Sequence, residues 1–266
     1  MENIYNYETL KVESISHKNN NIFQVTLNRE QALNSLNLTM LNELSNLFDK
    51  IKKDNSIKTV LITGVGKSFC AGADITQLKM LDKETGYSFA TSGQEIFNKI
   101  ENLGKPVLAA INGYCFGGGL ELAMACTIRI ASDKALFGQP EIKLGIIPGY
   151  GGTQRLSRLI GKGRTIDVCL TGDNIKPEDA LNWGLITKIT DNQELLNISY
   201  DALIKLNKMP RLAMQSIITT INEGFNLYMD EALELEAEHF AKLCSKEDKN
   251  IGVDAFLSKQ KPEFKD

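Results

Sequence analysis

Apolar and polar side chains follow patterns that predict a series of strand–turn–helix units over the first 192 residues. Residues 22–27 alternate apolar and polar side chains, which predicts a half-buried strand. Residues 41–51 carry apolar side chains at spacings of three and four, which predicts an amphipathic helix whose first turn Ser35 or Asn37 can cap. A second strand is expected over residues 58–63.

Further along, residues 79–95 are rich in Lys, Asp, Thr, Ser and Gly, which predicts a mobile loop or exposed connection before a helix over 94–102. A helix is also expected to begin at residue 176. Four short apolar runs predict further strands, over residues 107–111, 128–131, 135–137 and 185–189.

Strand signals stop at about residue 193, and the rest of the chain has helical periodicity. Three consecutive helices are expected, over residues 195–206, 212–224 and 231–244. The sequence therefore predicts an α/β core over residues 1–192, which carries the candidate chemistry, and a helical region over 193–266.

The segment from Pro106 to Gly152 holds the strongest chemical signal. Three glycines, Gly117 to Gly119, precede a helix-compatible stretch, so backbone can approach a ligand closely and unpaired N–H groups can face a negative charge. Glu121 falls in the first turn of this helix, and a second carboxylate, Glu141, follows twenty residues later. The pattern fits enolate or acyl chemistry, but it fits equally a tightly packed strand–helix turn with a solvated acid.

A similar turn occurs earlier, around Gly72. Small neighbours permit close approach of backbone here, and Ala73 is placed to offer an N–H group to a ligand. The Asp74 side chain is expected to cap the helix that follows.

Composition narrows the class of protein. The chain has 266 residues, of which 42% are hydrophobic and 24% charged, as is usual for a globular protein. A net charge of −3 argues against nucleic-acid binding. Neither a signal peptide nor a membrane span is indicated, and five scattered cysteines without a C-x-x-C pair suit reduced thiols in the cytoplasm and offer no metal site.

Five motifs in series closely resemble those of the enoyl-CoA hydratase (crotonase) family. They are Ala71-Gly72-Ala73-Asp74-Ile75, Asn112-Gly113-Tyr114, Gly117-Gly118-Gly119-Leu120-Glu121, Phe137-Gly138-Gln139-Pro140-Glu141 and Pro148-Gly149-Tyr150-Gly151-Gly152-Thr153-Gln154-Arg155. The resemblance implies an α/β spiral of repeated ββα units, like that of the Clp protease, with a C-terminal helical region that builds trimers. Two trimers would stack into a homo-hexamer, and the substrate would be an acyl-CoA thioester, with no metal or redox cofactor.

The resemblance also assigns roles to individual residues. Ala73 and Gly118 would supply the backbone N–H groups of an oxyanion hole, and Glu121 and Glu141 would be the catalytic pair. The implied substrate-binding positions are Ala32, Leu33, Ala71, Gly72, Asp74, Ile75, Gly149 and Lys259, the last reaching the ligand of a neighbouring subunit.

The function implied is reversible addition of water to a short-chain trans-2-enoyl-CoA, with crotonyl-CoA as the expected substrate. Glu121, ionised at its helix start, would deprotonate water, and Glu141, with a pKa raised by apolar neighbours, would donate a proton. Two alternatives stay open: an enoyl-CoA isomerase or other acyl-CoA lyase of the family, and a non-catalytic RNA-binding relative. The presence of both glutamates favours the hydratase.

Overall fold

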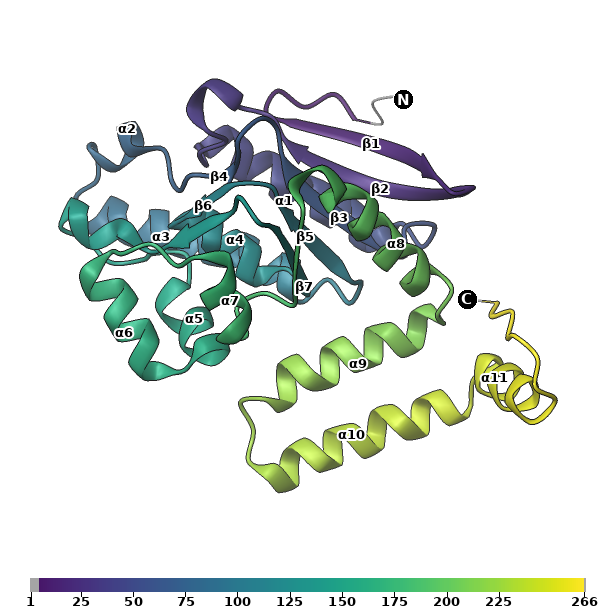
Figure 1. Cartoon of the computed structure of the whole chain (residues 1–266). Coiled ribbons are helices and arrows are strands. Elements are labelled where there is room, and N and C mark those ends of the chain that lie inside the picture. Colours follow the sequence, from purple (N-terminus) through teal and green to yellow (C-terminus); the bar gives the residue numbers. More distant parts are fainter. Residues whose placement is uncertain (1–4, 266) are drawn as a thin grey trace.

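A computed structural model describes residues 5–265 of the chain, so the ends of the two expected regions, residues 1–4 and residue 266, lie outside the described part. Two sheets form the core (Figure 1). The larger has the order β1-β2-β3-β5-β7-β9 and the smaller the order β4-β6-β8. The strands are β1 (Leu10–His17), β2 (Asn20–Leu27), β3 (Val60–Gly64), β4 (Ser68–Cys70), β5 (Val107–Ile111), β6 (Tyr114–Phe116), β7 (Ile128–Ser132), β8 (Leu136–Gly138) and β9 (Lys188–Thr190).

The order of strands confirms the repeated ββα units. Each of the pairs β3–β4, β5–β6 and β7–β8 gives its first strand to the large sheet and its second to the small one. All pairings between neighbours are parallel except that of β1 with β2. Because parallel strands end at the same edge, the segments that follow β4, β6 and β8 gather on one side of the molecule.

The first strand, β1, was not predicted. It forms a two-residue hairpin with β2, in which Lys18 and Asn19 both have positive φ. The polar residues of β1 hide its pattern, since Glu13 is buried within it. The last strand also differs, because it begins at Lys188 rather than at residue 185.

The helices that cover the sheets follow the expected order, with one clear correction. Of residues 79–95, only 79–82 are a connection: a capping box between Asp82 and Thr85 starts a long helix, α3 (Lys83–Glu101). Its first half is polar, so apolar periodicity begins only near residue 93. Asn37 caps α1 (Leu38–Lys53) by accepting a hydrogen bond from the Met40 N–H at 2.9 Å.

The remaining helices of the core are short, and several connect directly to the segments that follow the small sheet. They are η1 (Glu30–Ala32), α2 (Ile75–Leu78), α4 (Gly118–Ala125), η2 (Pro140–Leu144), α5 (Gly152–Ile160), α6 (Lys162–Thr171), α7 (Pro177–Asn182) and η3 (Asn192–Glu194). Together with α1 and α3 they enclose the main apolar core, of which Phe48, Phe69, Phe97 and Phe137 are fully buried members.

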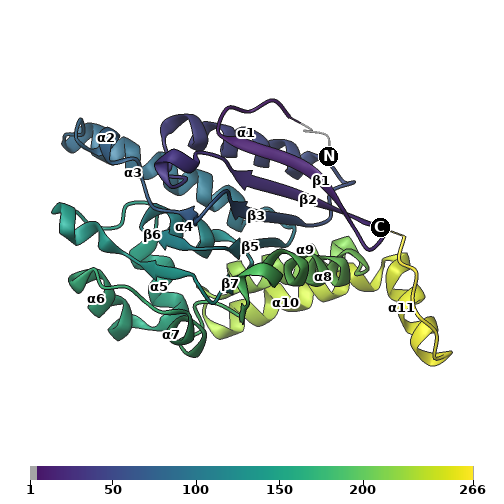
Figure 2. The same cartoon turned by 45° about the horizontal axis from the view of Figure 1, so that its top comes forward.

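The predicted helical region is present and contains one more helix than expected. It consists of α8 (Leu195–Asn207), α9 (Arg211–Gly224), α10 (Met229–Cys244) and the unpredicted α11 (Glu247–Leu257). Helix α8 packs on the large sheet through Leu195 and Leu203. Helices α9 and α10 lie side by side, and α11 lies at the far side of the molecule from α2 in both views (Figures 1 and 2). Within residues 5–265, none of the helices combines the length and apolar character needed to cross a membrane.

Helix α4 lies unusually close to the end of β4, and Gly119 makes this possible. A Cβ atom at Gly119 would lie 2.1 Å from the Cys70 carbonyl oxygen.

We expect Gly119→Ala to lower the free energy of unfolding by at least ~1–3 kcal/mol, because backbone would have to move. Gly163 is the matched control, with nothing within 4 Å of its Cβ position; Gly163→Ala should gain ~0.4–1 kcal/mol. Urea unfolding of both variants measures the difference, and equal effects would contradict this account.

Candidate active site

A cavity of about 1000 Å³ opens where the segments after β4, β6 and β8 meet. Its walls are mostly apolar, and they bring together residues from α2, α3, α4 and the loop before α5. The predicted site residues that line it are Ala73, Ile75, Gly118, Glu121, Glu141 and Gly149. The volume suits a drug-sized or larger organic ligand.

Two backbone N–H groups meet at this cavity. Ala73 follows β4, and the two residues on either side of it are fixed by hydrogen bonds with Leu36, from Leu36 N to the Gly72 carbonyl at 2.8 Å and from Asp74 N to the Leu36 carbonyl at 2.9 Å. Gly118 begins α4 after Gly117, whose φ of 49° only glycine adopts readily. A Cβ at Gly118 would lie 3.3 Å from the Ala73 nitrogen. Within residues 5–265, neither the Ala73 nor the Gly118 N–H donates a hydrogen bond to the protein.

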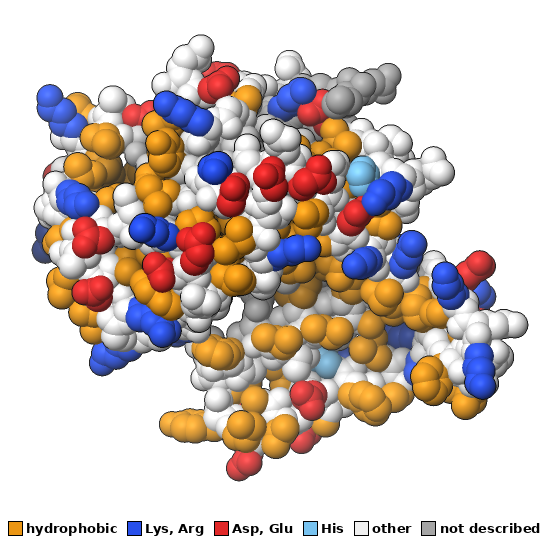
Figure 3. All heavy atoms as spheres, viewed as in Figure 1, with side chains coloured by type: hydrophobic (Ala, Val, Ile, Leu, Met, Phe, Trp, Pro, Cys, Tyr) orange, Lys and Arg blue, Asp and Glu red, His pale blue; other side chains and the backbone are white. Residues whose placement is uncertain are grey.

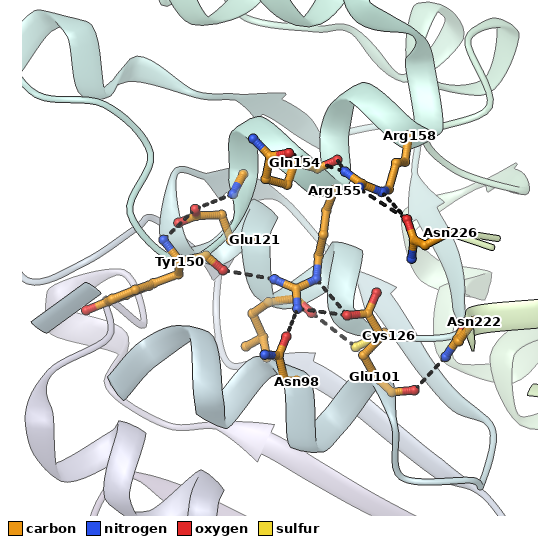
Figure 4. A network of polar contacts seen from close by, with 12 residues as sticks. Asn98, Glu101, Glu121, Cys126, Tyr150, Gln154, Arg155, Arg158, Asn222 and Asn226 are labelled. Atoms are coloured by element: carbon orange, nitrogen blue, oxygen red, sulfur yellow. Dashed lines mark hydrogen bonds and ion pairs between the residues drawn. The ribbon is translucent and has the colours of Figure 1, made fainter. Parts of the chain in front are cut away.

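Glu121 lies in the first turn of α4, as predicted, but its side chain is buried with only 1% exposure. Its Oε1 accepts hydrogen bonds from the N–H groups of Tyr150, at 2.8 Å, and Gly152, at 2.6 Å (Figure 4). Burial raises the pKa of Glu121 to about 8, and the Glu141 carboxyl adds to this effect. The two N–H donors and Arg155 act in the opposite direction.

Glu141 lies in the first turn of η2 and its carboxyl approaches the start of α4. Its Oε1 is 2.6 Å from where a Cβ of Gly117 would be, so a side chain at this position would have to displace the carboxyl. With its amide turned to donate, the buried Gln139 places its side-chain nitrogen 3.1 Å from both Glu141 oxygens. Burial raises the pKa of Glu141 to about 7.

The predicted contrast between the two carboxyl groups is therefore wrong. The helix start was expected to keep Glu121 ionised while only Glu141 had a raised pKa. Burial outweighs the helix dipole and the hydrogen bonds at Glu121, so both pKa values are raised to near neutrality. The two groups form a coupled pair that can hold one proton at neutral pH.

The other predicted binding positions lie beside the cavity or away from it. Ala71 and Leu33 pair through a backbone hydrogen bond of 3.0 Å, next to Ala32 and Gly72, and none of these four residues lines the cavity. The Asp74 side chain caps α2 by accepting a hydrogen bond from the Thr76 N–H at 3.2 Å, as predicted, and it also forms an ion pair with Arg29 at 3.1 Å. Lys259 is exposed beyond the end of α11 and is not part of the cavity wall.

Several residues that complete the site were not assigned roles from the sequence. The Gln139 side chain lies within hydrogen-bond distance of Glu141. The N–H groups of Tyr150 and Gly152, which lie 29 and 31 residues after Glu121 in the sequence, donate hydrogen bonds to the Glu121 carboxyl. Arg155 supports the same loop. The motif Gly151-Gly152-Thr153-Gln154-Arg155 was the sequence signal for the contacts of Gly152 and Arg155, because its glycines begin α5 where close approach of the backbone is needed. In the described part of the chain, no three His, Cys, Asp or Glu side chains are grouped so as to hold a metal ion.

Comparison with known proteins identifies the family of the chain. The sequence profile of the enoyl-CoA hydratase/isomerase family matches residues 17–266, so the chain belongs to this family. It is 42% identical to the short-chain-enoyl-CoA hydratase of Clostridium acetobutylicum, over 94% of this chain and 96% of the relative. It is also 38% identical to the crotonyl-CoA hydratase of Syntrophomonas wolfei, over 97% and 98% of the two chains.

The fold is shared with solved structures of the same family. The enoyl-CoA hydratase from Bacillus anthracis superimposes with a TM-score of 0.91 at 33% identity, covering 97% of this chain and 99% of that one. The predicted crotonase fold is thereby confirmed.

Proposed function

We propose that this protein is a hydro-lyase that adds water reversibly across the 2,3-double bond of a short-chain trans-2-enoyl-CoA to give a 3-hydroxyacyl-CoA. The observation that carries this proposal is that two unpaired N–H groups and two carboxyl groups with raised pKa values line one cavity. The names of the relatives point to the same reaction.

The N–H groups of Ala73 and Gly118 would bind the thioester oxygen. When water adds at C3, the electrons of the double bond move toward the thioester, and negative charge develops on that oxygen as an enolate. Two fixed donors are suited to stabilise this charge, each contributing ~2.7–4 kcal/mol. Among the described residues no protein group accepts a hydrogen bond from either N–H, so no such bond has to break when the substrate binds.

The carboxyl pair would move the protons. One carboxylate takes a proton from water as the water oxygen bonds to C3, and the other carboxylic acid gives its proton to C2. The pair still holds one proton, now on the former base, and this proton must return to the former acid before the next turnover. We assign the first role to Glu121, because two N–H donors hold its Oε1 as an acceptor. Both pKa values are raised to near neutrality, so the pair holds one proton at neutral pH and either carboxyl can carry it. This chemistry needs neither a metal nor a redox cofactor.

The absorbance of the conjugated enoyl thioester gives a direct test. Loss of this absorbance should be fastest with crotonyl-CoA (but-2-enoyl-CoA) and should fall as the chain lengthens through six, eight and ten carbons. Conversion of 3-enoyl-CoA to 2-enoyl-CoA without hydration would show an isomerase instead. Tight RNA binding without any thioester turnover would end the proposal.

Helices α9, α10 and α11 would form the interface of a homo-hexamer built from two trimers. Hydrophobic side chains gather along α9 and α10 on the face shown in Figure 3. Large exposed side chains of α9, α10 and the turn between them include Ile221, Phe225, Tyr228 and Phe240, and α11 adds Phe256; Tyr228 is 85% and Phe256 83% exposed. So much exposed apolar surface is unusual unless another chain covers it. Sedimentation velocity should give the mass of six chains, and a monomer would contradict this assignment.

The free cysteines suit a reducing, cytoplasmic setting.

A further inference from the structure

Arg155 contacts the loop that holds Glu121 (Figure 4). Its Nη1 donates a hydrogen bond to the Tyr150 carbonyl oxygen at 2.9 Å. This carbonyl belongs to the peptide unit between Tyr150 and Gly151. The N–H groups of Tyr150 and Gly152, on either side of that unit, both donate to Glu121 Oε1. Arg155 therefore fixes the orientation of the peptide that separates the two donors to Glu121.

The conformation of the loop from Tyr150 to Gly152 also depends on its contact with Arg155. Gly151 has a φ of 108°, and a Cβ there would lie 2.3 Å from Arg155 Nη1. The Arg155 N–H in turn bonds to the Gly151 carbonyl at 2.8 Å. Side chain and backbone of Arg155 thus bind two consecutive carbonyl groups of the loop.

The guanidinium is itself held firmly by α3. Its Nη2 lies 2.8 Å from Glu101 Oε2 and 2.6 Å from Asn98 Oδ1, and its Nε lies 3.1 Å from the same Glu101 oxygen. The Arg155 side chain is only 11% exposed. The Glu101 carbonyl accepts a hydrogen bond from Asn222 of α9 at 3.0 Å, which adds a link to the C-terminal helices. A planar, multiply bonded guanidinium in a partly buried place is a rigid support.

We infer that Arg155 is a positioning residue for Glu121: it holds the Tyr150–Gly152 loop so that both N–H donors meet one carboxyl oxygen. The inference rests on the proposed function for its catalytic consequence. It also has an electrostatic part, because the positive charge of Arg155 favours the ionised form of Glu121. The other titratable groups that act on or with Glu121 are Glu141, the Tyr150 hydroxyl and Cys169.

The test compares Arg155→Gln and Arg155→Lys with Arg158→Gln. Arg158 lies on the same helix and carries the same charge, but it is exposed and bonds to Asn226 and Gln154. We expect Arg155→Gln to lower kcat for crotonyl-CoA ~10–100-fold with KM changed less than about twofold, because Glu121 is misplaced while the thioester site is not. Arg158→Gln should behave as wild type.

The pH dependence of kcat distinguishes the effect of the positive charge of Arg155 from the effect of its hydrogen bonds. In Arg155→Gln the pKa of Glu121 rises, so the acid limb of kcat moves to higher pH. Arg155→Lys keeps the charge but cannot reproduce the planar contacts, so its kcat should fall while its acid limb stays near that of wild type. If Arg155→Gln keeps kcat within twofold of wild type, or if Arg158→Gln loses as much, the inference is wrong.

A second measurement does not depend on turnover. Carboxyl ¹³C NMR of glutamate-labelled protein, with Glu121 assigned by Glu121→Gln, should show a higher pKa of Glu121 in Arg155→Gln and an unchanged one in Arg158→Gln. If Arg155→Gln does not fold, Asn98→Ala, which removes a support of Arg155 without changing any charge, should show a smaller rise. A wild-type protein that hydrates no enoyl-CoA would end the proposed function, whereas an unchanged pKa would end this inference.

Discussion

Glu141→Gln should lower kcat for hydration of crotonyl-CoA by about 10²–10⁴-fold while leaving binding of the thioester largely intact. The amide is nearly the same size as the carboxyl but has no proton to give to C2. The oxyanion donors, Ala73 and Gly118, are backbone groups on other segments and do not change. Steady-state kinetics of crotonyl-CoA hydration and the Kd of the saturated analogue butyryl-CoA measure the two effects separately.

A matched control is Glu178→Gln, which removes an exposed carboxylate from the first turn of α7, away from the cavity. It should keep wild-type kcat. Retention of more than about a tenth of wild-type kcat by Glu141→Gln would contradict the proposed role. Loss of Glu141 also removes one of the two causes that raise the pKa of Glu121, so that pKa should fall in the variant.

Local sequence chemistry predicted the parts of the site that local structure builds. Gly117 and the first turn of α4 follow from glycine conformation and helix geometry, and the structure places Glu121 there. Asp74 and Asn37 cap their helices for similar local reasons. The five motifs further indicated the family, and through it the repeated ββα units.

Features that depend on distant contacts could not be predicted in the same way. Burial raises the pKa of Glu121, and hydrogen bonds from the N–H groups of Tyr150 and Gly152, which lie 29 and 31 residues away in the sequence, lower it. The strand β1 lies at the edge of the large sheet and carries polar residues, and the apolar Phe89 and Ala90 in the first half of α3 line the cavity. A pattern search based on core burial does not detect such elements.

Glu121→Gln should be nearly inactive and yet more stable than the wild-type protein at alkaline pH. Loss of the base should lower kcat by ~10²–10⁴-fold. The amide oxygen of glutamine can still accept the hydrogen bonds of Tyr150 and Gly152, so the loop before α5 should keep its conformation. The expected gain in the free energy of unfolding follows from the raised pKa of Glu121 in the wild-type protein.

In the folded protein the pKa of Glu121 is about 8, whereas the ordinary value is 4.5. Between these two pH values the unfolded chain has released a proton that the folded chain still binds, so the stability of the wild-type protein falls as pH rises through this window. Glutamine does not titrate and avoids this loss. The variant should therefore match the wild type near pH 4.5 and exceed it above pH 8, by a difference on the order of a few kcal/mol.

Urea unfolding at a series of pH values measures this difference, with Glu178→Gln as the control that should show no such trend. A gain that does not change with pH would mean that burial of the Glu121 charge is not its cause. A loss of stability at every pH would mean that the carboxylate is needed to hold the Tyr150 and Gly152 N–H groups. In that case the site would hold Glu121 ionised throughout, and the proton that the mechanism requires would have to reside on Glu141 alone.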